Sequence, residues 1–561
     1  MSLYTFMFAG SSTIDQPWFV EPQTGRTITG REVKIRTDAL ASGLSTLLAL
    51  ESCTRSVKAG AHLDDGIRDV VAVITPNCLD FGPVVWASHK LGCTVACING
   101  GSTMEEMTYQ LSLSGARAIF AHDECLERVI GAARECHILL SHIIAISDGL
   151  GCVPPEAKDI LTAEELIGMG TEYPYLANHL NPIAFLCFSS GTTGLPKAVV
   201  IPHSAVVANV TQLQNASVPT CRVSPGDRAL GVVPFSHMFG LLTLIHLCPH
   251  LGIATVAFKS MPDFNTLLKT ITRLRIGHIF LVPSLVNAFT KHPATAQYDL
   301  TLILKSAMIA AAPMDSRTES EFQAIGGPDF LVTQGFGMTE CCGLVTGLPF
   351  GTSPRPGSVG RVLPFTEAKI VDEYGSSLPP GHRGQLCVRG PQLCRGYLKN
   401  EQATRDAFDA DGFLLTGDVA EITPDGYVHI VDRLKSMIKN KGYQVSPAEL
   451  EAHLLSLDVL DDAAVVASPN DRCGEVPVAF VVLSAVGRQQ ASQDPDAVKE
   501  AIKMSVQEAK SSYKWLHDVR FVNNIPRLPS GKIIRHRLKQ MLGAAKSVDV
   551  SLSQTGPSLT R

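Results

Sequence analysis

Two patterns of hydrophobic and polar positions alternate along the first part of the chain. Continuous apolar runs at residues 69–74, 116–121 and 143–147 are separated by segments whose apolar residues recur at helical spacing, around residues 81–91 and 104–113. Such runs are typical of strands buried in a parallel sheet, and helical spacing is typical of helices that cover its faces. The pattern therefore predicts parallel sheets covered by helices.

The same alternation continues through the middle of the chain, with strands predicted at residues 229–235, 254–259 and 278–283. The most apolar stretch, from Ala229 to Phe258, is long enough to span a bilayer. Two prolines and three histidines interrupt it: Pro234, His237, His246, Pro249 and His250. We therefore expect this stretch to form buried core of one large α/β domain rather than a membrane span.

The pattern changes after about residue 365, where short strands with alternating apolar positions follow one another. Asp425-Gly426 is a hairpin turn signal between two of them, which predicts a small antiparallel, barrel-like β part. A helix is predicted to begin at Ser446. There, Ser446, Pro447 and Glu449 match an N-cap, a first-turn proline and the reciprocal glutamate of a capping box.

A second compact unit is predicted after this helix, with strands at residues 463–468, 478–484 and 519–523 and a helix over residues 496–510. The predicted fold class is thus α/β, with a large N-terminal domain of α/β subdomains plus the small β part, followed by a small C-terminal α+β domain. The predicted limits are 1–432 for the large domain, 433–545 for the small one and 546–561 for a Ser- and Thr-rich, disordered tail.

Length and composition narrow the class of protein. A chain of 561 residues with 45% hydrophobic and 18% charged residues exceeds what one core usually serves and is typical of folded proteins. The net charge of −5 comes without a long basic run, so nucleic acid is not expected as a partner. The 15 cysteines include no CxxC pair, which favours reduced thiols in a reducing compartment.

The ends of the chain give an expectation about location. The N-terminus lacks a basic region and reaches an acid at Asp15, so a signal peptide is not expected. The last three residues, Leu559, Thr560 and Arg561, do not match a peroxisomal address of the Ser-Lys-Leu type. The cytoplasm is therefore the predicted location.

The segment FSSGTTGLPK at residues 188–197 has the composition of a phosphate loop without its spacing. Only two residues, rather than four, separate Gly191 from Gly194, and Lys197 is followed by Ala198, so the common P-loop is excluded. Glycines let backbone N–H groups approach a polyanion, hydroxyls donate further hydrogen bonds and a lysine adds positive charge. A polar surface turn has the same composition, so this segment alone leaves both interpretations open.

Further motifs follow the loop in a fixed order. They are QGFGMTE at 334–340, TGD at 416–418, DRLKSMIKNKGYQVSPAELE at 432–451 and RLPSGKIIR at 527–535. Together with the loop, they resemble the acyl-adenylate-forming superfamily of acyl-CoA synthetases, peptide-synthetase adenylation domains and beetle luciferases. The 4-coumarate–CoA ligase and luciferase branch is the most similar, and the resemblance extends from about residue 20 to 540.

The resemblance implies a nucleotide site for ATP with Mg²⁺. Thr339 would contact the α-phosphate and Glu340 would hold Mg²⁺, a hard cation that takes oxygen ligands. Phe336 stands where the family usually has Tyr, and its ring would stack on adenine, while Asp418 and Arg433 would contact the ribose. The remaining implied nucleotide contacts are Gly335 and Gly337 and, around the β- and γ-phosphates, Ser189, Ser190, Gly191, Thr192, Thr193, Gly194 and Lys197.

The resemblance also implies a division of labour between two half-reactions. The Lys532 ammonium would meet the charge that develops between the carboxylate and the α-phosphate. The mobile small domain would then rotate about Lys435 and bring Lys439 and Gly442 towards the tunnel for the pantetheine arm of CoA. Such a rotation is expected because one site cannot present Lys532 and admit a thiol from the same side.

The resemblance places an acyl pocket at His237, Phe239, Ala310, Gly335, Cys341 and Gly343. His237 would orient the acyl group or shield the adenylate from water, although a buried histidine bonded to backbone groups is the structural alternative. Ala310 replaces a commoner glycine, and its methyl would narrow the pocket. Apolar residues near Cys341 predict a hydrophobic acid, either aryl or medium-chain fatty, without deciding between them.

Four functions remain open from the sequence. The first is an acyl- or aryl-CoA ligase, and the second is an acyl-AMP ligase that loads a separate carrier protein, since no carrier motif follows residue 540. The others are a luciferase-like oxygenase and a nucleotide-binding protein without catalysis. Intact Lys197, Glu340 and Lys532 argue against the last of these. The sequence favours the CoA ligase.

Overall fold

The computed structural model of the chain forms two compact units, Met1–Ile430 (unit 1) and Val431–Arg561 (unit 2). It describes residues 1–48, 67, 69–147, 159–170, 182–189, 196–216, 223–312, 314, 316–349, 352–440, 443–470, 472–528 and 531–544. The domain limits expected from the sequence stay a prediction, and the predicted disordered tail lies outside the described residues.

An eight-stranded sheet forms the first half of unit 1, in the order β22-β9-β8-β4-β3-β5-β6-β7. Pairing is parallel from β8 to β7 and antiparallel from β8 to β9 and β22. The strands are β3 Val71–Thr75, β4 Val95–Asn99, β5 Ala118–His122, β6 Ile143–Ile146, β7 Leu161–Thr162, β8 Ile183–Ser189, β9 Lys197–Pro202 and β22 Gly396–Tyr397. The three strands and the parallel pairing predicted for this region are confirmed.

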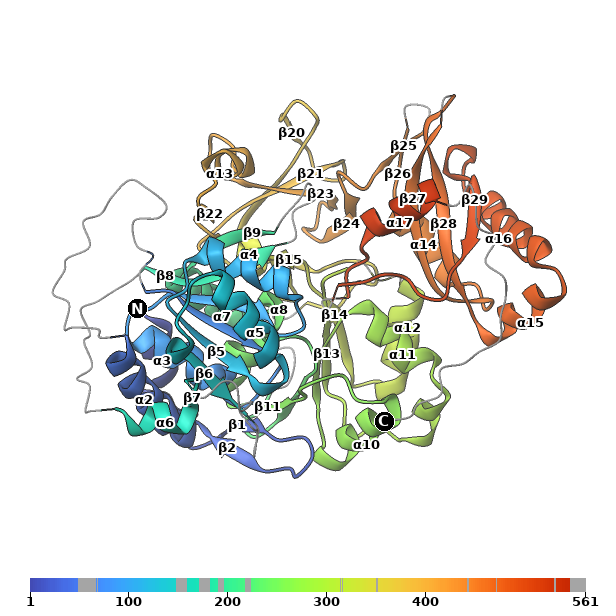
Figure 1. Cartoon of the computed structure of the whole chain (residues 1–561). Helices are drawn as coiled ribbons and strands as arrows, with labels where there is room; N and C mark the ends of the chain where they lie inside the picture. Colours follow the sequence, from blue (N-terminus) through green and yellow to red (C-terminus); the bar gives the residue numbers. More distant parts are fainter. Residues whose placement is uncertain are drawn as a thin grey trace. The chain divides into compact units, whose positions relative to one another are not determined.

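Helices cover both faces of this sheet because alternate strand residues point to opposite sides. Ala72 and Ile74 of β3 pack with α4 and α5, whereas Val71 and Val73 pack with α2, α3 and α7. Figure 1 shows these helices around the blue strands. The helices of this half are α1 Leu3–Phe8, α2 Gly30–Leu47, α3 Phe81–Lys90, α4 Met104–Ser114, η1 Asp123–Cys125, α5 Leu126–Glu135, η2 Leu140–His142, α6 Ala163–Gly168 and α7 His203–Ala216.

A seven-stranded sheet forms the second half of unit 1, in the order β14-β13-β12-β10-β11-β1-β2. It is parallel except for the β1–β2 pair, and helices α10, α11 and α12 cover one of its faces (Figure 1). The strands are β1 Pro17–Val20, β2 Thr27–Thr29, β10 Arg228–Gly231, β11 Ala254–Ala257, β12 His278–Leu281, β13 Ser306–Ile309 and β14 Leu331–Gln334. The helices are α8 Met238–Gly240, the π-helix η4 Leu241–Leu247, α9 Cys248–His250, α10 Phe264–Leu274, α11 Pro283–Lys291, η5 Pro293–Gln297 and α12 Ser316–Gly326.

The strand predicted over residues 229–235 is shorter than expected, because it ends at Gly231. Beyond that point the Asn77 side chain replaces the sheet as a partner for the backbone. Its amide nitrogen donates to the carbonyl oxygens of Gly231 and Val233, and its oxygen accepts the Phe235 N–H. The apolar stretch around these residues is buried, as predicted. Among the described residues, no helix is long and apolar enough to cross a membrane.

The predicted β part is a five-stranded antiparallel sheet in the order β20-β19-β21-β23-β24. The turn at Asp425-Gly426 joins β23 to β24, and the Gly426 N–H donates to the Thr423 carbonyl oxygen across it. The strands are β19 Glu367–Val371, β20 Ser377–Leu378, β21 Arg383–Arg389, β23 Leu414–Ile422 and β24 Val428–Arg433, and helix α13 spans Glu401–Ala407. Two short ladders precede the sheet, β15 Gly337–Met338 with β16 Gly343–Leu344 and β17 Thr346–Gly347 with β18 Arg361–Val362, and η6 Thr339–Cys341 joins β15 to β16.

Unit 2 is an α+β body built on one sheet, in which β28 pairs antiparallel with β27 and β25 and parallel with β29. Its strands are β25 Ile438–Asn440, β26 Tyr443–Val445, β27 Leu460–Asn470, β28 Gly474–Leu483 and β29 Asp518–Phe521. Its helices are α14 Pro447–Leu455, α15 Ala485–Gln493, α16 Pro495–Ala509, η7 Ser512–Lys514 and α17 Arg535–Ala544. The three strands and the helix that were predicted here are confirmed.

Ser446 is the N-cap of helix α14, as predicted, but the prediction of a full capping box is wrong. The Ser446 hydroxyl accepts the Glu449 N–H, which is the N-cap half of the motif. The Glu449 carboxylate instead accepts hydrogen bonds from the Lys514 ammonium at 2.7 and 2.8 Å. Two lysines, Lys510 and Lys514, therefore compete with the backbone for the carboxylate that the box requires.

The cysteines that the structure describes carry no disulfide. Most are buried, and burial raises the pKa of thiols such as Cys93 and Cys248. Neutral, buried thiols behave as small apolar side chains, which agrees with the predicted reduced state.

Candidate active site

The glycine-rich loop predicted to bind phosphate connects two adjacent antiparallel strands. Ser189 ends β8, Lys197 begins β9, and these two residues are direct partners in the ladder. The strands therefore bring the first hydroxyl and the lysine of the motif to one end of a hairpin. The other predicted members, Ser190, Gly191, Thr192, Thr193 and Gly194, lie outside the described residues.

The QGFGMTE motif folds as strand β15 and the 3-10 turn η6, which contains Thr339 and Glu340. Close pairing of β15 with β16 explains the glycine at 337, because a Cβ at Gly337 would lie 1.8 Å from the Gly343 carbonyl oxygen. Gly343 itself has φ of +127°, and a Cβ there would meet Leu242 at 2.2 Å. The backbone is thus fixed where the two polar residues project.

Glu340 and Lys197 meet the same side chain, Tyr397 of β22. The Tyr397 hydroxyl donates to Glu340 Oε1 at 3.0 Å, and Lys197 Nζ lies 4.7 Å from the centroid of the Tyr397 ring. Glu340 is only 6% exposed. A carboxylate, a phenol and an ammonium from three distant parts of the sequence therefore form one cluster.

The electrostatics of this cluster keep the phenol protonated. Burial, followed by the Glu340 carboxylate, raises the pKa of the Tyr397 hydroxyl. The same two causes, in the same order, raise the pKa of the neighbouring Cys394 thiol. Both groups stay neutral at ordinary pH, and Tyr397 acts as a hydrogen-bond donor to Glu340.

Sequence reasoning missed Tyr397. It lies in Arg395-Gly396-Tyr397, outside the motifs that drew attention, and a two-residue strand has no hydrophobic period to mark it. The available signal was the glycine before it. Gly396 has φ of +132°, and a Cβ there would lie 2.4 Å from the Thr404 side chain. Such a glycine marks a backbone that is held in an unusual conformation.

The predicted acyl-pocket residues lie on several elements of unit 1. The His237 Nδ1 atom accepts the Phe239 N–H at 3.4 Å and caps α8, and the Phe239 ring packs edge-on against Phe280 with centroids 6.1 Å apart. The π-helix η4 begins directly after α8, and π-helical segments are rare and frequent at functional sites. Because of its backbone contact, the structural alternative for His237 stays open alongside the predicted role.

The other predicted pocket residues are small or buried. Ala310 follows β13, is 5% exposed and has no left-handed φ, so its methyl is accepted without backbone strain. Cys341 is fully buried, and a Cβ at Gly335 would meet the Leu344 side chain at 3.1 Å. Phe336, predicted to stack on adenine, is 9% exposed and packs with Cys341 and other residues of the β part. These roles stay predictions.

A buried amide network that sequence reasoning missed holds β16 in place. The Asn209 amide of α7 accepts the Leu344 N–H at 2.9 Å and donates to the Leu344 carbonyl oxygen at 2.8 Å. Asn209 also donates to Gln212, whose amide reaches the Pro364 carbonyl oxygen. Two amides three residues apart on the buried face of a largely apolar helix were the signal, because buried polar groups require partners.

The two predicted ribose contacts lie in different units. Asp418 of β23 is 3% exposed, and its N–H donates to Thr416 Oγ1 at 3.1 Å. It stands beside Gly417, whose φ is +71°, where the register between β21 and β23 shifts. An irregularity of this kind changes the direction in which the side chains of a strand point. Arg433 ends β24 in unit 2, and its N–H donates to the carboxylate of Asp432.

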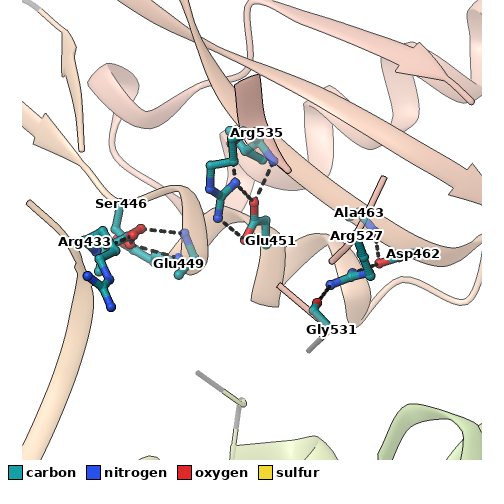
Figure 2. A network of polar contacts seen from close by, with 12 residues as sticks. Arg433, Ser446, Glu449, Glu451, Asp462, Ala463, Arg527, Gly531 and Arg535 are labelled. Atoms are coloured by element: carbon teal, nitrogen blue, oxygen red, sulfur yellow. Dashed lines mark hydrogen bonds and ion pairs between the residues drawn. The ribbon is translucent and has the colours of Figure 1, made fainter. Parts of the chain in front are cut away.

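Lys532 lies in unit 2, at a turn that backbone hydrogen bonds hold at both ends. The Leu528 N–H donates to the Lys532 carbonyl oxygen, and the Gly531 N–H donates to the Leu528 carbonyl oxygen, both at 2.8 Å. Arg527 clamps the turn, because its guanidinium donates to the Gly531 carbonyl oxygen and to the Asp462 carboxylate (Figure 2). The turn is therefore fixed to β27.

A second set of polar contacts in unit 2 involves both ends of the motif at 432–451 and the last residue of the motif at 527–535. The Asp432 carboxylate accepts from the Ser446 hydroxyl at 2.7 Å and the Ala448 N–H at 2.9 Å. The Arg535 guanidinium pairs with Glu451 of α14 and donates to the Val465 carbonyl oxygen (Figure 2). Burial raises the pKa of Asp432 against these hydrogen bonds. Sequence reasoning assigned no role to Asp432, Glu451 or Arg535.

The predicted hinge and CoA segment follows β24. Lys435 lies in a turn in which the Ser436 and Met437 N–H groups both donate to the Arg433 carbonyl oxygen. Lys439 is exposed on β25, and its N–H donates to the Glu475 carboxylate. Gly442 lies outside the described residues. The hinge and CoA roles of these residues stay predictions.

The residues around Glu340 fit a Mg²⁺ ion that reaches the site together with phosphates. Among the described residues, no group of three or more His, Cys, Asp or Glu side chains is arranged to hold a metal. Within the same ranges, Glu340 Oε1 has Tyr397 as its partner, which leaves Oε2 for a ligand. Mg²⁺ is commonly held by one or two carboxylates plus substrate phosphates and water, so one oriented carboxylate suits it.

Comparison with known proteins assigns the family. The model of the AMP-binding enzyme family matches residues 9–398, and the model of the AMP-binding enzyme C-terminal domain matches residues 449–532. The chain belongs to the AMP-binding enzyme family. The family predicted from the motifs is therefore confirmed.

Two curated relatives and one solved structure illustrate the likeness. The chain is 34% identical to 4-coumarate–CoA ligase 2 of Oryza sativa subsp. japonica, over 97% of this chain and 93% of the relative. It is 33% identical to the acyl-CoA ligase AFT1-1 of Alternaria alternata, again over 97% and 93%. A benzoate CoA ligase from Burkholderia xenovorans LB400 shares the fold, with a TM-score of 0.79 at 21% identity over 96% of this chain and all of that one.

The matches also bear on the predicted class of enzyme. Relatives that span nearly the whole chain are named CoA ligases, and the predicted class, an AMP-forming acid–thiol ligase, is confirmed. ATP and CoA are substrates of the CoA ligases in this family. The acid and the final acceptor belong to the proposal that follows.

Proposed function

We propose that this protein activates a hydrophobic carboxylic acid, aryl or medium-chain fatty, as its acyl-adenylate and transfers the acyl group to CoA. The observation that carries the proposal is the cluster of Lys197, Tyr397 and Glu340, which joins a cation at the end of a glycine-rich hairpin to a buried carboxylate. A polyphosphate needs both kinds of group, because its oxygens bind cations directly and through Mg²⁺.

In this proposal unit 1 binds the nucleotide. Ser189, Lys197 and the loop between them contact the β- and γ-phosphates, and Thr339 contacts the α-phosphate. Glu340 holds Mg²⁺, which when bound spreads the negative charge of the phosphates. Gly335, Phe336 and Gly337 form the wall next to adenine. Asp418 and Arg433 are assigned to the ribose hydroxyls.

The first half-reaction joins the acid to AMP. A carboxylate oxygen attacks the α-phosphorus of ATP, the bond from that phosphorus to the bridging oxygen breaks, and pyrophosphate leaves with the electron pair. Two anions approach each other in this step, so a cation beside the reacting oxygens stabilises the transition state. Lys532 supplies that cation, and the clamp of Arg527 on its turn supports the assignment.

The second half-reaction transfers the acyl group. The CoA sulfur attacks the carbonyl carbon of the adenylate, the carbon–oxygen bond to AMP breaks, and AMP leaves with the electron pair while the thiol proton passes to solvent. Lys435 is the proposed hinge for the change between half-reactions, and Lys439 and Gly442 are the proposed contacts of the pantetheine arm. A thiol has a usable thiolate fraction near neutral pH, so a strong base is not required.

The acid is proposed to be hydrophobic because the residues assigned to its pocket are buried and uncharged. Phe239, Ala310 and Cys341 are at most 8% exposed. Gly335 and Gly343 complete the assigned pocket, and the methyl of Ala310 narrows it. His237 is proposed to orient the acyl group or to shield the adenylate from water, and its ring caps α8.

Activity assays on the whole protein test this proposal. Incubation with ATP, Mg²⁺, CoA and a panel of aryl and medium-chain acids should yield AMP and acyl-CoA in equal amounts with at least one acid. Adenylate that accumulates despite CoA, and moves to a separate carrier protein with a pantetheine arm, would instead support an acyl-AMP ligase. Release of neither AMP nor pyrophosphate with any acid would contradict both.

A further inference from the structure

Tyr397 makes two contacts of different kinds with groups of opposite charge. Its hydroxyl donates to Glu340 Oε1 at 3.0 Å, and the face of its ring receives Lys197 Nζ at 4.7 Å from the centroid. A phenol accommodates both at once, because the ring face attracts a cation while the hydroxyl donates to an anion. The two charges are thus held at different parts of one side chain.

The backbone fixes Tyr397 in register with both partners. Tyr397 pairs with Val199 of β9, so its side chain lies diagonally across the ladder from Lys197, within reach of a long side chain. The Cys394 N–H donates to the Glu340 carbonyl oxygen at 2.8 Å, which ties η6 to the segment that leads into β22. The Tyr397 N–H donates to Thr404 Oγ1 of α13 at 2.9 Å. Three elements therefore determine where the phenol stands.

The separation of Lys197 from Glu340 keeps each side chain available for a different ligand. Lys197 and Glu340 both lie beside Tyr397, yet within the described ranges no ion pair joins them. A direct ion pair would engage both charges, so the cation needed for phosphate and the carboxylate needed for Mg²⁺ would neutralise each other. The hydrogen bond from Tyr397 engages Oε1 of Glu340 and leaves Oε2 available to a ligand.

We propose that Tyr397 is a positioning residue that keeps Lys197 and Glu340 apart and oriented, so that the first binds phosphate and the second binds Mg²⁺. This inference rests on the nucleotide site of the proposed function. Tyr397 itself contacts neither substrate nor metal in this account. Its effect passes through the two charged groups.

Nucleotide binding measured by calorimetry separates the two contacts of Tyr397. The probe is α,β-methylene-ATP, which cannot react, with and without Mg²⁺. Tyr397→Phe removes only the hydroxyl, so the gain in affinity on adding Mg²⁺ should shrink about tenfold, as expected for a lost hydrogen bond to a carboxylate. Affinity without Mg²⁺ should stay unchanged, because the ring still carries Lys197.

Tyr427→Phe is the matched control. The Tyr427 hydroxyl donates to the Ser353 carbonyl oxygen at 3.0 Å, and its ring receives Arg355 at 4.1 Å and Arg361 at 4.7 Å. It therefore combines a hydroxyl donor with cation contacts, and these partners are residues other than Glu340 and Lys197. This variant should retain the wild-type dependence of nucleotide binding on Mg²⁺.

Two further variants test the mechanism. Tyr397→Leu removes both contacts, so Lys197 and Glu340 can pair, and nucleotide affinity without Mg²⁺ should also fall several-fold. In a Glu340→Gln background, Tyr397→Phe should produce no further change in Mg²⁺ dependence, because a residue that acts through Glu340 has nothing left to orient. A merely structural role would give the same loss in both backgrounds.

The proposal is overturned if Tyr397→Phe, folded with a wild-type unfolding midpoint, keeps the full response to Mg²⁺, or if its loss persists unchanged in the Glu340→Gln background. These outcomes do not depend on the acid. A wild-type protein that binds nucleotide with Mg²⁺ but activates no acid would contradict the proposed function and still allow the role of Tyr397 to be decided.

Discussion

At the scale of single residues, the proposed chemistry depends on charged groups that the fold holds in defined places. Glu340 is buried and bonded to a phenol, and Lys532 stands on a turn that Arg527 ties to Asp462. The sequence alone could name Lys197, Glu340 and Lys532 because motifs carry them. It could not name Tyr397 or Arg527 as their supports, because those roles arise from contacts between segments distant in the chain.

Lys532→Ala should slow formation of the adenylate by about 10² to 10³, the scale of removing one transition-state charge stabiliser. A supplied acyl-adenylate should still react with CoA at close to the wild-type rate, because the second half-reaction does not use this ammonium. Pyrophosphate exchange measures the first step, and single-turnover thioester formation measures the second.

Lys539→Ala is the control for that variant, because Lys539 is an exposed lysine of α17 in the same unit. It should leave both half-reactions unchanged. An equal loss of both steps in Lys532→Ala would show that the assigned division of labour is incorrect.

At the scale of elements, prediction succeeded where a periodic pattern was long. The pattern indicated helices over residues 81–91 and 104–113, and the structure has α3 at Phe81–Lys90 and α4 at Met104–Ser114. The two-residue strands β15, β16 and β22 could not be predicted, because they are too short to show a period. These strands nevertheless carry or flank much of the candidate site.

Gly337→Ala should destabilise unit 1 by about 1–3 kcal/mol, the usual cost of overpacking. Its Cβ would lie 1.8 Å from the Gly343 carbonyl oxygen, so β15 and β16 would have to separate. Urea unfolding measures the loss, and nucleotide binding should weaken with it.

Gly168→Ala is the matched control, because a Cβ at that position in α6 has nothing within 4 Å. Its free energy of unfolding should be unchanged or slightly higher, since alanine favours helices over glycine. Equal stability of the two variants would mean that the β15–β16 contact is looser than described.

At the scale of the whole molecule, the predicted fold class, a large α/β domain followed by a small α+β domain, agrees with the structure. The pH dependence of stability, in contrast, depends on buried histidines that the hydrophobic pattern does not reveal. Three histidines from α3, α7 and η4, namely His89, His203 and His246, are buried in unit 1. The His89 and His246 rings contact Phe185, and the His203 ring contacts His89. Burial lowers the pKa of His89 well below its usual value, that of His203 to about 3 and that of His246 to about 4. These histidines are neutral in the folded protein.

Stability should therefore fall as the pH drops below about 6.5, the unperturbed histidine pKa. The unfolded chain binds protons there and the folded chain does not, so unfolding gains about 1.4 kcal/mol per pH unit for each histidine until its folded pKa is reached. Urea unfolding at pH 7.5, 6.0 and 5.0 measures the slope. His246→Asn should lower this slope by close to the contribution of one proton. An unaltered slope would contradict the assignment of a buried, neutral His246.

The central claim is that one nucleotide site in this protein converts a carboxylic acid into a mixed anhydride with AMP. Exchange of radiolabelled pyrophosphate into ATP, measured without CoA across aryl and medium-chain acids, tests it most directly. The account predicts exchange that requires both Mg²⁺ and one of these acids, and that is lost in Glu340→Gln. Absence of exchange with every acid, from a protein that binds ATP, would contradict it.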